Sequence, residues 1–379
     1  MFNTRAGAAR LILAALATTL AVSACGHNYG VAPATGQAAA PQTNAAGSDV
    51  SPDSSSVLKS LKKQVVIGSA VDPDNGAGNP YGLTVAPVTN GDFTKGDLAI
   101  CNFNAKSNKQ GTGESVVALH PKPGSKPLHV SSIKPLKGCD ALALGGDDTI
   151  WAASMVANDN PIISTTGDLI DNIKGNPFSQ PWGQIFATPT SGSPAFYETN
   201  AHTGTIVRIN LGSSFTYDVI GAGFPVNHGK PGTALAPSGL AYDASSDTLY
   251  FVDGMNDTLV AFKDVSSIPD GGIVAQNNGM KFSGPSASDA RVVFSGKPLN
   301  GPISTALLPN GSIVAGNTLD PDGKNLMVEI TPAGKLLDVR NVDKGAAGSI
   351  FGMVATGTAA DTKIYFNDDN DNNLQVLER

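Results

Sequence analysis

The stretch APSGLAYDASSDTLYFVDGMNDTLVAF, residues 236–262, decides how the rest of the chain is interpreted. It contains three short apolar runs, over residues 237–243, 248–253 and 258–262, divided by turns of small and polar residues. Short apolar runs separated by Gly, Asn and Asp are typical of an antiparallel β-meander. A single meander cannot bury both of its faces, so the pattern predicts neighbouring units of the same kind.

Comparable units recur along the chain. Their marker residues are spaced by 57, 44, 56, 62 and 51 residues, and the markers are Gly82, Cys139, Gly183, Gly239, Gly301 and Gly352. Most of these steps exceed the about 40–50 residues usual for one propeller blade, which predicts long connecting loops. Two such loops are expected at 158–179 and 221–237, where they would shape a functional rim. We therefore predict an all-β fold, a six-bladed β-propeller.

The 237–262 unit resembles the NHL-type repeat. It reads Pro-x-Gly-Leu-Ala-x-Asp, followed by Leu-Tyr-Phe-Val-Asp-x-x-Asn-Asp-x-Leu-x-x-Phe. The resemblance extends from about residue 81 to residue 377 and is sharp in this one unit. It implies a six-bladed propeller but no single activity, because one fold hosts many unrelated functions.

The N-terminal residues 1–24 read as a secretory signal. Arg5 and Arg10 precede an apolar run over 11–22 that is too short to span a bilayer. The end of this segment, Leu20-Ala21-Val22-Ser23-Ala24-Cys25, resembles a bacterial lipobox. The resemblance implies cleavage before Cys25 and lipidation of that cysteine, including palmitate. Gly26 in place of aspartate implies the outer membrane, so we expect a lipid-anchored protein of the bacterial cell envelope. Ordinary cleavage nearby, leaving a free thiol, is the alternative.

Residues 25–56 are rich in Ala, Pro, Gly and Ser and have few large apolar side chains. Such a composition favours a disordered tether of roughly 30 Å end-to-end distance. Residues 57–379 then form the propeller. The run Gln64-Val65-Val66-Ile67-Gly68 reads as a strand, and we predict that it completes the last blade, because the sixth unit runs out of chain at Arg379.

The charge excludes one class of partner. Of the 25 basic residues, Arg5 and Arg10 leave with the signal, so 23 remain against 32 acidic residues, a net charge of −9. No basic patch stands out, which argues against nucleic acid or anionic lipid as a partner.

Cys101 and Cys139 remain after Cys25 is assigned to the lipid. In an exported chain an even pair is most simply a disulfide, here between adjacent blades. Two free buried thiols are the alternative. The five histidines show no paired ligand spacing with these cysteines, which argues against zinc.

A set of amide and carboxylate residues ends equivalent strands of five units: Asn102, Asn200, Asp253, Asn317 and Asn367. Equivalent strand ends lie on one face of a propeller, and oxygen ligands suit hard cations. The set resembles the calcium-centred funnel of gluconolactonase-like propellers, which implies a metal that polarises an ester carbonyl. The chain departs from that family because neither Glu114 nor Glu198 is a convincing glutamate ligand. Strand termination by turn-forming residues is the alternative.

Other candidates are less specific. The acidic run 367–373 fits no calcium-loop register and reads as a hairpin turn with Asx-type caps. His202 and His228 fall in loops, where solvated histidines are the simpler reading. No Gly-x-Ser-x-Gly or phosphate-binding loop is present in the sequence, so no catalytic residue is assigned.

These observations favour a tethered propeller that binds a protein or small-molecule ligand and needs no cofactor. A calcium-dependent lactonase or esterase in the central channel is the alternative, and a structural role in the envelope is a third.

Overall fold

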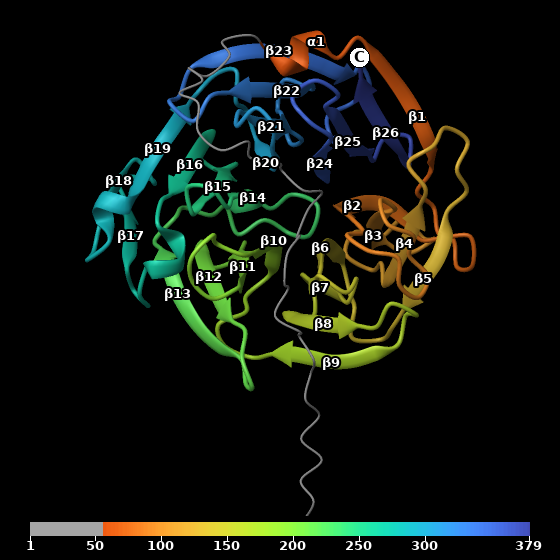
Figure 1. Ribbon diagram of the computed structural model, residues 1–379, viewed down its shortest axis with the longest axis horizontal. Coiled ribbons are helices and arrows are strands. Elements are labelled where there is room, and N and C mark those ends of the chain that lie inside the picture. The colour runs from red at the N-terminus through yellow and green to blue at the C-terminus, as the bar shows by residue number, and fades with distance from the viewer. Residues whose placement is uncertain (1–55) are drawn as a thin grey trace, which may run out of the picture. The chain divides into compact units, whose positions relative to one another are not determined.

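The computed structural model describes residues 56–379. The predicted signal segment, Cys25 and most of the predicted tether lie outside the described residues. Six β-sheets surround a central channel in the described part of the chain, and each sheet is one blade (Figure 1). The prediction of an all-β, six-bladed propeller is confirmed.

Each blade starts with an inner strand at the channel and continues outward by antiparallel pairing. Blade 1 contains β2 (Gly78–Val85), β3 (Leu98–Asn104), β4 (Ser115–Leu119) and β5 (Leu128–Ser132). Blade 2 contains β6 (Cys139–Leu144), β7 (Ile150–Ser154), β8 (Asp159–Ile163) and β9 (Leu169–Lys174). Blade 3 contains β10 (Pro181–Ala187), β11 (Ala195–Asn200), β12 (Thr205–Asn210) and β13 (Thr216–Ala222).

The second half of the ring repeats the arrangement. Blade 4 contains β14 (Pro237–Asp243), β15 (Thr248–Asp253), β16 (Thr258–Phe262) and β19 (Ala290–Ser295). Blade 5 contains β20 (Pro302–Leu307), β21 (Ile313–Asn317), β22 (Asn325–Ile330) and β23 (Leu336–Asp343). Blade 6 contains β24 (Met353–Thr356), β25 (Lys363–Asp368), β26 (Asn373–Glu378) and, outermost, β1 (Lys63–Ser69).

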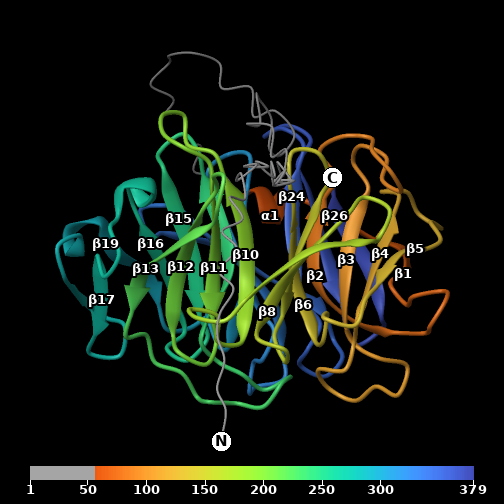
Figure 2. The same ribbon diagram turned by 90° about the horizontal axis from the view of Figure 1, so that it is seen from below.

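Blade 3 is wider than the others because a hairpin from blade 4 extends it. The insertion between β16 and β19 forms η1 (Val265–Ser267), β17 (Ile273–Gln276), β18 (Lys281–Ser283) and η2 (Ala287–Asp289). Strand β17 pairs in parallel with β13. Figure 2 shows β10 to β13 following one another outward, with β17 beyond them.

The N-terminal strand closes the ring. Strand β1 pairs antiparallel with β26, from Lys63 opposite Glu378 to Ser69 opposite Asn373, and the two lie side by side in Figure 1. The edge of β26 is thereby covered, which removes an open site for strand addition. The predicted closing strand at 64–68 is confirmed.

A single helical turn fixes the start of the described chain. Helix α1 (Val57–Ser60) begins at Ser56, whose Oγ accepts a hydrogen bond from the N–H of Lys59. The buried carboxylate of Glu329 in blade 5 accepts hydrogen bonds from the N–H of Leu58 at 2.9 Å and from Ser56 Oγ at 2.6 Å. Negative charge at the free N–H groups of a helix start is favourable, so Glu329 docks this turn on blade 5.

The blades are held together by apolar side chains. Among the described residues, six buried clusters each lie between two neighbouring blades. Near the channel, small residues take over, because the inner strands approach one another closely. A Cβ built on Gly82 would lie 2.8 Å from the Cα of Ala141 in the next blade, so a side chain cannot be placed there without a shift.

Two expectations from the sequence need correction. Half of the long loop expected at 158–179 is instead the strands β8 and β9, whereas residues 223–236 do form a loop. The marker residues Cys139 and Gly301 are also out of register, because Ala141 and Ser304 occupy the positions equivalent to Gly82 in blades 2 and 5. No helix of residues 56–379 is long and apolar enough to cross a membrane.

Candidate functional site

The central channel holds a polar recess. This cavity has a volume of about 450 Å³, part of it open to solvent, and is lined by residues of all six inner strands. Its polar side chains are Asp140, Gln184, Ser304 and Thr305, and apolar and glycine residues form the rest of the wall. The site is therefore built by the strands that define the fold and not by a single loop.

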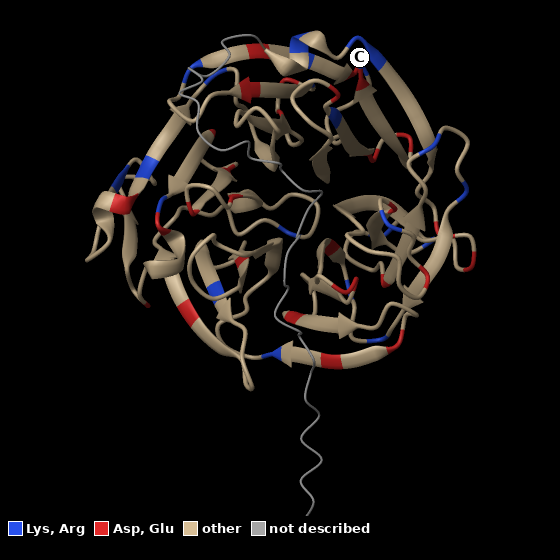
Figure 3. Cartoon of the chain, viewed as in Figure 1, with Lys and Arg blue, Asp and Glu red and all other residues tan. Residues whose placement is uncertain are grey.

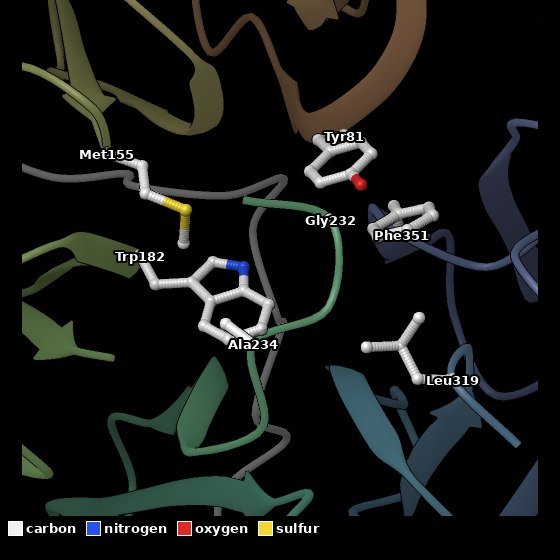
Figure 4. A pocket seen from close by; sticks show the side chains of 7 residues that line it. All are labelled: Tyr81, Met155, Trp182, Gly232, Ala234, Leu319 and Phe351. Atoms are coloured by element: carbon white, nitrogen blue, oxygen red, sulfur yellow. The ribbon is translucent and has the colours of Figure 1, made fainter. Parts of the chain in front are cut away.

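One mouth of the channel is closed by apolar residues. Residues 223–236, here called the mouth loop, place Gly232 and Ala234 over a second cavity of about 190 Å³ (Figure 4). Tyr81, Trp182 and Phe351 line both cavities. The Tyr81 ring stacks on Phe351 with centroids 3.6 Å apart.

Asp140 is the unusual residue of the cavity wall. It lies on β6, is 3% exposed, and neither of its carboxylate oxygens has a hydrogen-bond partner among residues 56–379. Burial raises the pKa of Asp140 well above its usual range, and the nearby carboxyl group of Glu198 raises it further, against the backbone N–H groups of Asp140 and Ala141, which lower it. A buried carboxyl group that lacks a positively charged partner is unfavourable in its charged form, so these surroundings favour the protonated acid.

A buried amide–carboxyl network lies next to Asp140. Gln184 Nε2 donates to Glu198 Oε2 at 2.9 Å, and Asn160 Nδ2 donates to the same oxygen. Gln184 Nε2 also donates to Asn160 Oδ1. Burial raises the pKa of Glu198 to about 8, against these hydrogen bonds, which lower it. Glu198 Oε1 and Gln184 Oε1 are buried and without partners in the described chain.

The predicted oxygen ligands Asn200 and Asn317 bind their own loops. Asn200 accepts a hydrogen bond from the N–H of Ser179 and donates to the carbonyl of Pro177, just before β10. Asn317 accepts from the N–H of Asn300 and donates to the carbonyl of Pro298, just before β20. Ser154 makes the same two contacts in blade 2. These side chains clamp the loop that enters each blade, and they sit on the second strand rather than on the channel-lining strand.

Asp253, Asn102 and Asn367 differ from that pattern. Asp253 accepts from the N–H of Met255 at 3.0 Å, and burial raises its pKa to about 7. Asn102 donates to the carbonyl of Ala70 at 3.0 Å. Asn367 is one residue out of register: β25 ends at Asp368, which pairs across its hairpin as Asp253 does.

Asn367 instead points to the neighbouring blade. Its Nδ2 donates to the carbonyl of Gly82 at 3.0 Å, and its Oδ1 is buried without a partner in the described region. Residues 56–379 contain no group of three or more His, Cys, Asp or Glu that could hold a metal ion. Metal binding by the five-residue set stays a prediction.

The remaining candidates lie outside the channel. His202 and His228 face each other with ring centroids 5.2 Å apart, and both are exposed in loops. Glu114 is exposed, whereas Glu198 is fully buried in the network described above. The acidic run forms the hairpin between β25 and β26, as predicted from its Asx-type turn residues.

The predicted disulfide is present. Cys101 on β3 and Cys139 on β6 are bonded, with their Cα atoms 5.4 Å apart, and both are buried. The bond joins blades 1 and 2, and it fixes the residue immediately before Asp140.

Charged residues gather on no single blade. Figure 3 shows acidic and basic residues scattered over the outer strands and loops of all blades. Asp140 is thus notable for its place at the channel and not for belonging to a charged surface.

Asp140 was not predicted because of the register error in blade 2, and Gln184 was not predicted although its neighbour Gly183 was placed in the correct register. With the inner strands aligned on Gly82, Ala141, Gly183 and Gly352, the preceding residues are Tyr81, Asp140, Trp182 and Phe351. Blades 4 and 5 have Ser238 and Ile303 at this position, so Asp140 is the one acidic residue of the six, and it becomes recognisable once the strands are in register.

Comparison with known proteins supports the fold alone. No family model matches the chain, and no curated protein matches its sequence. Virginiamycin B lyase from Staphylococcus aureus is 15% identical, with a TM-score of 0.50, over 84% of this chain and 98% of that chain.

Two other solved structures are similar to the same extent. Regucalcin from Agrobacterium tumefaciens is 16% identical with a TM-score of 0.50, over 83% of this chain and 96% of that chain. A chain of the nidogen–laminin complex is 12% identical with a TM-score of 0.50, over 77% of this chain and 97% of that chain. At such identities these likenesses show that the chain has the β-propeller fold.

Proposed function

We propose that this chain is a binding protein of the bacterial cell envelope that encloses a small ligand in its central channel. The observation that carries the proposal is the carboxyl group of Asp140 at the 450 Å³ cavity, since neither of its oxygens has a hydrogen-bond partner among the described residues. Nearly all buried polar groups in proteins have partners, so an unpaired carboxyl group at a cavity is a place where a ligand supplies the missing donors.

The architecture of the cavity supports binding. Six inner strands form its wall, and the stacked layer of Tyr81 and Phe351 closes one mouth. A wall built from paired strands changes little when a ligand enters, so little ordering free energy is lost on binding. Hydrogen bonds made to a buried side chain such as that of Asp140 are stronger than in water, because the local dielectric constant is low.

Binding is tested with the purified full-length protein and extracts of small molecules from the producing cells. We expect a compound to be retained and identified by mass spectrometry, and we expect Asp140→Asn to retain at least tenfold less of it. Asp148→Asn is the matched control, because Asp148 is also buried with an unpartnered oxygen but lies in the turn between β6 and β7. Equal retention by both variants would contradict channel binding through Asp140.

The envelope location rests on the lipobox-like segment that ends at Cys25, together with an exported-type disulfide. We propose lipidation of Cys25, with residues 25–56 as the tether. Mass spectrometry of the protein from membranes is expected to show a lipid-modified N-terminal peptide, and Cys25→Ala is expected to move the protein into the soluble fraction. An unmodified peptide beginning at another residue would overturn the lipid anchor.

The second candidate function is hydrolysis of a lactone or ester with calcium. Its supporting observation is the carboxyl group of Glu198, which accepts a hydrogen bond at 2.9 Å from the cavity residue Gln184 and whose pKa burial raises to about 8. Regucalcin, one of the structurally similar proteins, is named a calcium-binding protein. Calcium-dependent turnover of simple lactones that is lost in Glu198→Gln would favour this candidate over the binding protein.

A further inference from the structure

Asp140 is flanked by aromatic residues on one level of the channel. Tyr81 in blade 1 and Trp182 in blade 3 occupy the strand position equivalent to that of Asp140 in blade 2. Phe351 holds the same position in blade 6, against Tyr81. All four residues line the 450 Å³ cavity, so it has one acidic side between apolar, aromatic walls.

The side of the cavity that carries Asp140 offers hydrogen-bond acceptors, and the amide of Gln184 there has no free N–H to donate. Both N–H bonds of Gln184 are directed at Asn160 and Glu198, which leaves Gln184 Oε1 unpartnered within the described chain. The two oxygens of Asp140 are unpartnered as well. A ligand that fits must therefore bring N–H or O–H donors, and a positive charge would compensate the buried carboxylate.

We propose that the cavity binds a small organic molecule through a primary ammonium group, which donates to Asp140 and Gln184 Oε1. Its apolar part packs against Tyr81, Trp182 and Phe351. This inference rests on the proposed channel binding and names the class of ligand.

Two other cations fit less well. A quaternary ammonium has no N–H and would leave the acceptors without donors. A divalent metal ion needs six or more oxygen ligands, whereas the polar side chains that line the cavity, Asp140, Gln184, Ser304 and Thr305, carry five oxygens between them. An organic ammonium is the cation that satisfies both the acidic side and the apolar walls of the same cavity.

Three matched probes test the ligand class: benzylamine, benzyl alcohol and benzyltrimethylammonium. Calorimetric titration of the full-length protein at pH 7 is expected to show benzylamine binding at least tenfold more tightly than either of the other two. Asp140→Asn is expected to weaken benzylamine binding by about 30-fold or more, as for loss of one partner of a buried charged pair. Asp148→Asn, with its buried carboxyl group away from the cavity, is expected to bind benzylamine as the wild type does.

Each other outcome overturns the inference in a recognisable way. Equal binding of benzylamine and benzyl alcohol, or wild-type affinity for benzylamine in Asp140→Asn, would show that Asp140 does not bind an ammonium group. Calcium binding that is lost in Asp140→Asn, with no amine binding, would replace the amine by a metal ion and leave channel binding intact. If none of the probes binds and Asp140→Asn also retains the cellular ligand, the proposed function fails together with the ligand class.

Discussion

The buried carboxyl group of Glu198 affects how the stability of this fold depends on pH. It has no exposed surface, and its oxygen Oε2 receives two amide N–H groups while Oε1 receives none from the described residues. Burial disfavours the charged form more strongly than the two hydrogen bonds favour it, so the pKa rises to about 8. The group therefore takes up protons on folding through most of the neutral range.

Replacing Glu198 by glutamine should flatten the dependence of stability on pH. Because the folded pKa of about 8 lies above the unfolded value of about 4.3, the folded protein holds the extra proton between these values. The free energy of unfolding then falls as pH rises across this window, and the fall is complete above pH 8. The free energy of unfolding of Glu198→Gln, measured relative to that of the wild type, should therefore increase by roughly 3–5 kcal/mol from pH 5 to pH 9.

Urea unfolding at pH 5, 7 and 9 measures this difference. Glu378→Gln is the control, since Glu378 is a partly exposed carboxylate 3.0 Å from Lys363 Nζ, and its loss should change stability by less than about 1 kcal/mol at any pH. Parallel pH profiles for Glu198→Gln and the wild type would show that Glu198 is ionised in the folded protein.

At the level of strands, the sequence predicted the elements better than their register. Apolar runs between turn residues located all six blades, because a meander alternates these features strictly. The register could not be derived, since glycine recurs at turns as well as at inner strands: Gly301 has a positive φ of 62° in a turn, while its supposed equivalent Gly82 faces blade 2. Identifying the residues that line the channel requires that register, so Asp140 could not be predicted. The disulfide could be predicted, because it required only an even number of cysteines.

The same reasoning applies to the amide side chains at strand ends. Turn propensity placed Asn200 and Asn317 correctly, but the sequence cannot show that their amides bind the loop entering the same blade. Contacts of that kind depend on how the chain folds back, and not on spacing along a strand.

Removing β1 should open the ring. A chain lacking residues 1–69 exposes the edge of β26 and loses Ile67, which packs in the cluster between blades 6 and 1. We expect its melting temperature to fall by more than about 10 °C, with aggregation on heating. A chain lacking residues 1–55 keeps both α1 and β1 and serves as the control. Equal melting of the two shortened chains, by calorimetry and light scattering, would show that β1 does not close the propeller.

At the level of the whole molecule, two connections of different kinds hold the ring together, one made by backbone pairing and one by a covalent bond. Strand β1 completes blade 6 through backbone pairing, and the disulfide ties blade 1 to blade 2 across their shared apolar cluster. Cys139 is followed directly by Asp140, so the covalent bond also fixes the strand that carries the acidic side of the cavity. Ring stability and the geometry of the ligand site are thereby linked.

Breaking the disulfide should lower both the free energy of unfolding and the affinity for benzylamine. Replacing Cys101 and Cys139 together by alanine removes a cross-link that spans 38 residues, which the chain-entropy relation values at about 3–4 kcal/mol of unfolding free energy. We expect guanidinium unfolding to show a loss of that size, and treatment of the wild type with a reductant to show the same loss. Because β6 is then held by hydrogen bonds and packing alone, benzylamine binding should weaken several-fold even at low temperature, where the variant stays folded. Unchanged binding in a destabilised variant would show that the bond serves the ring and leaves the position of Asp140 to the strands.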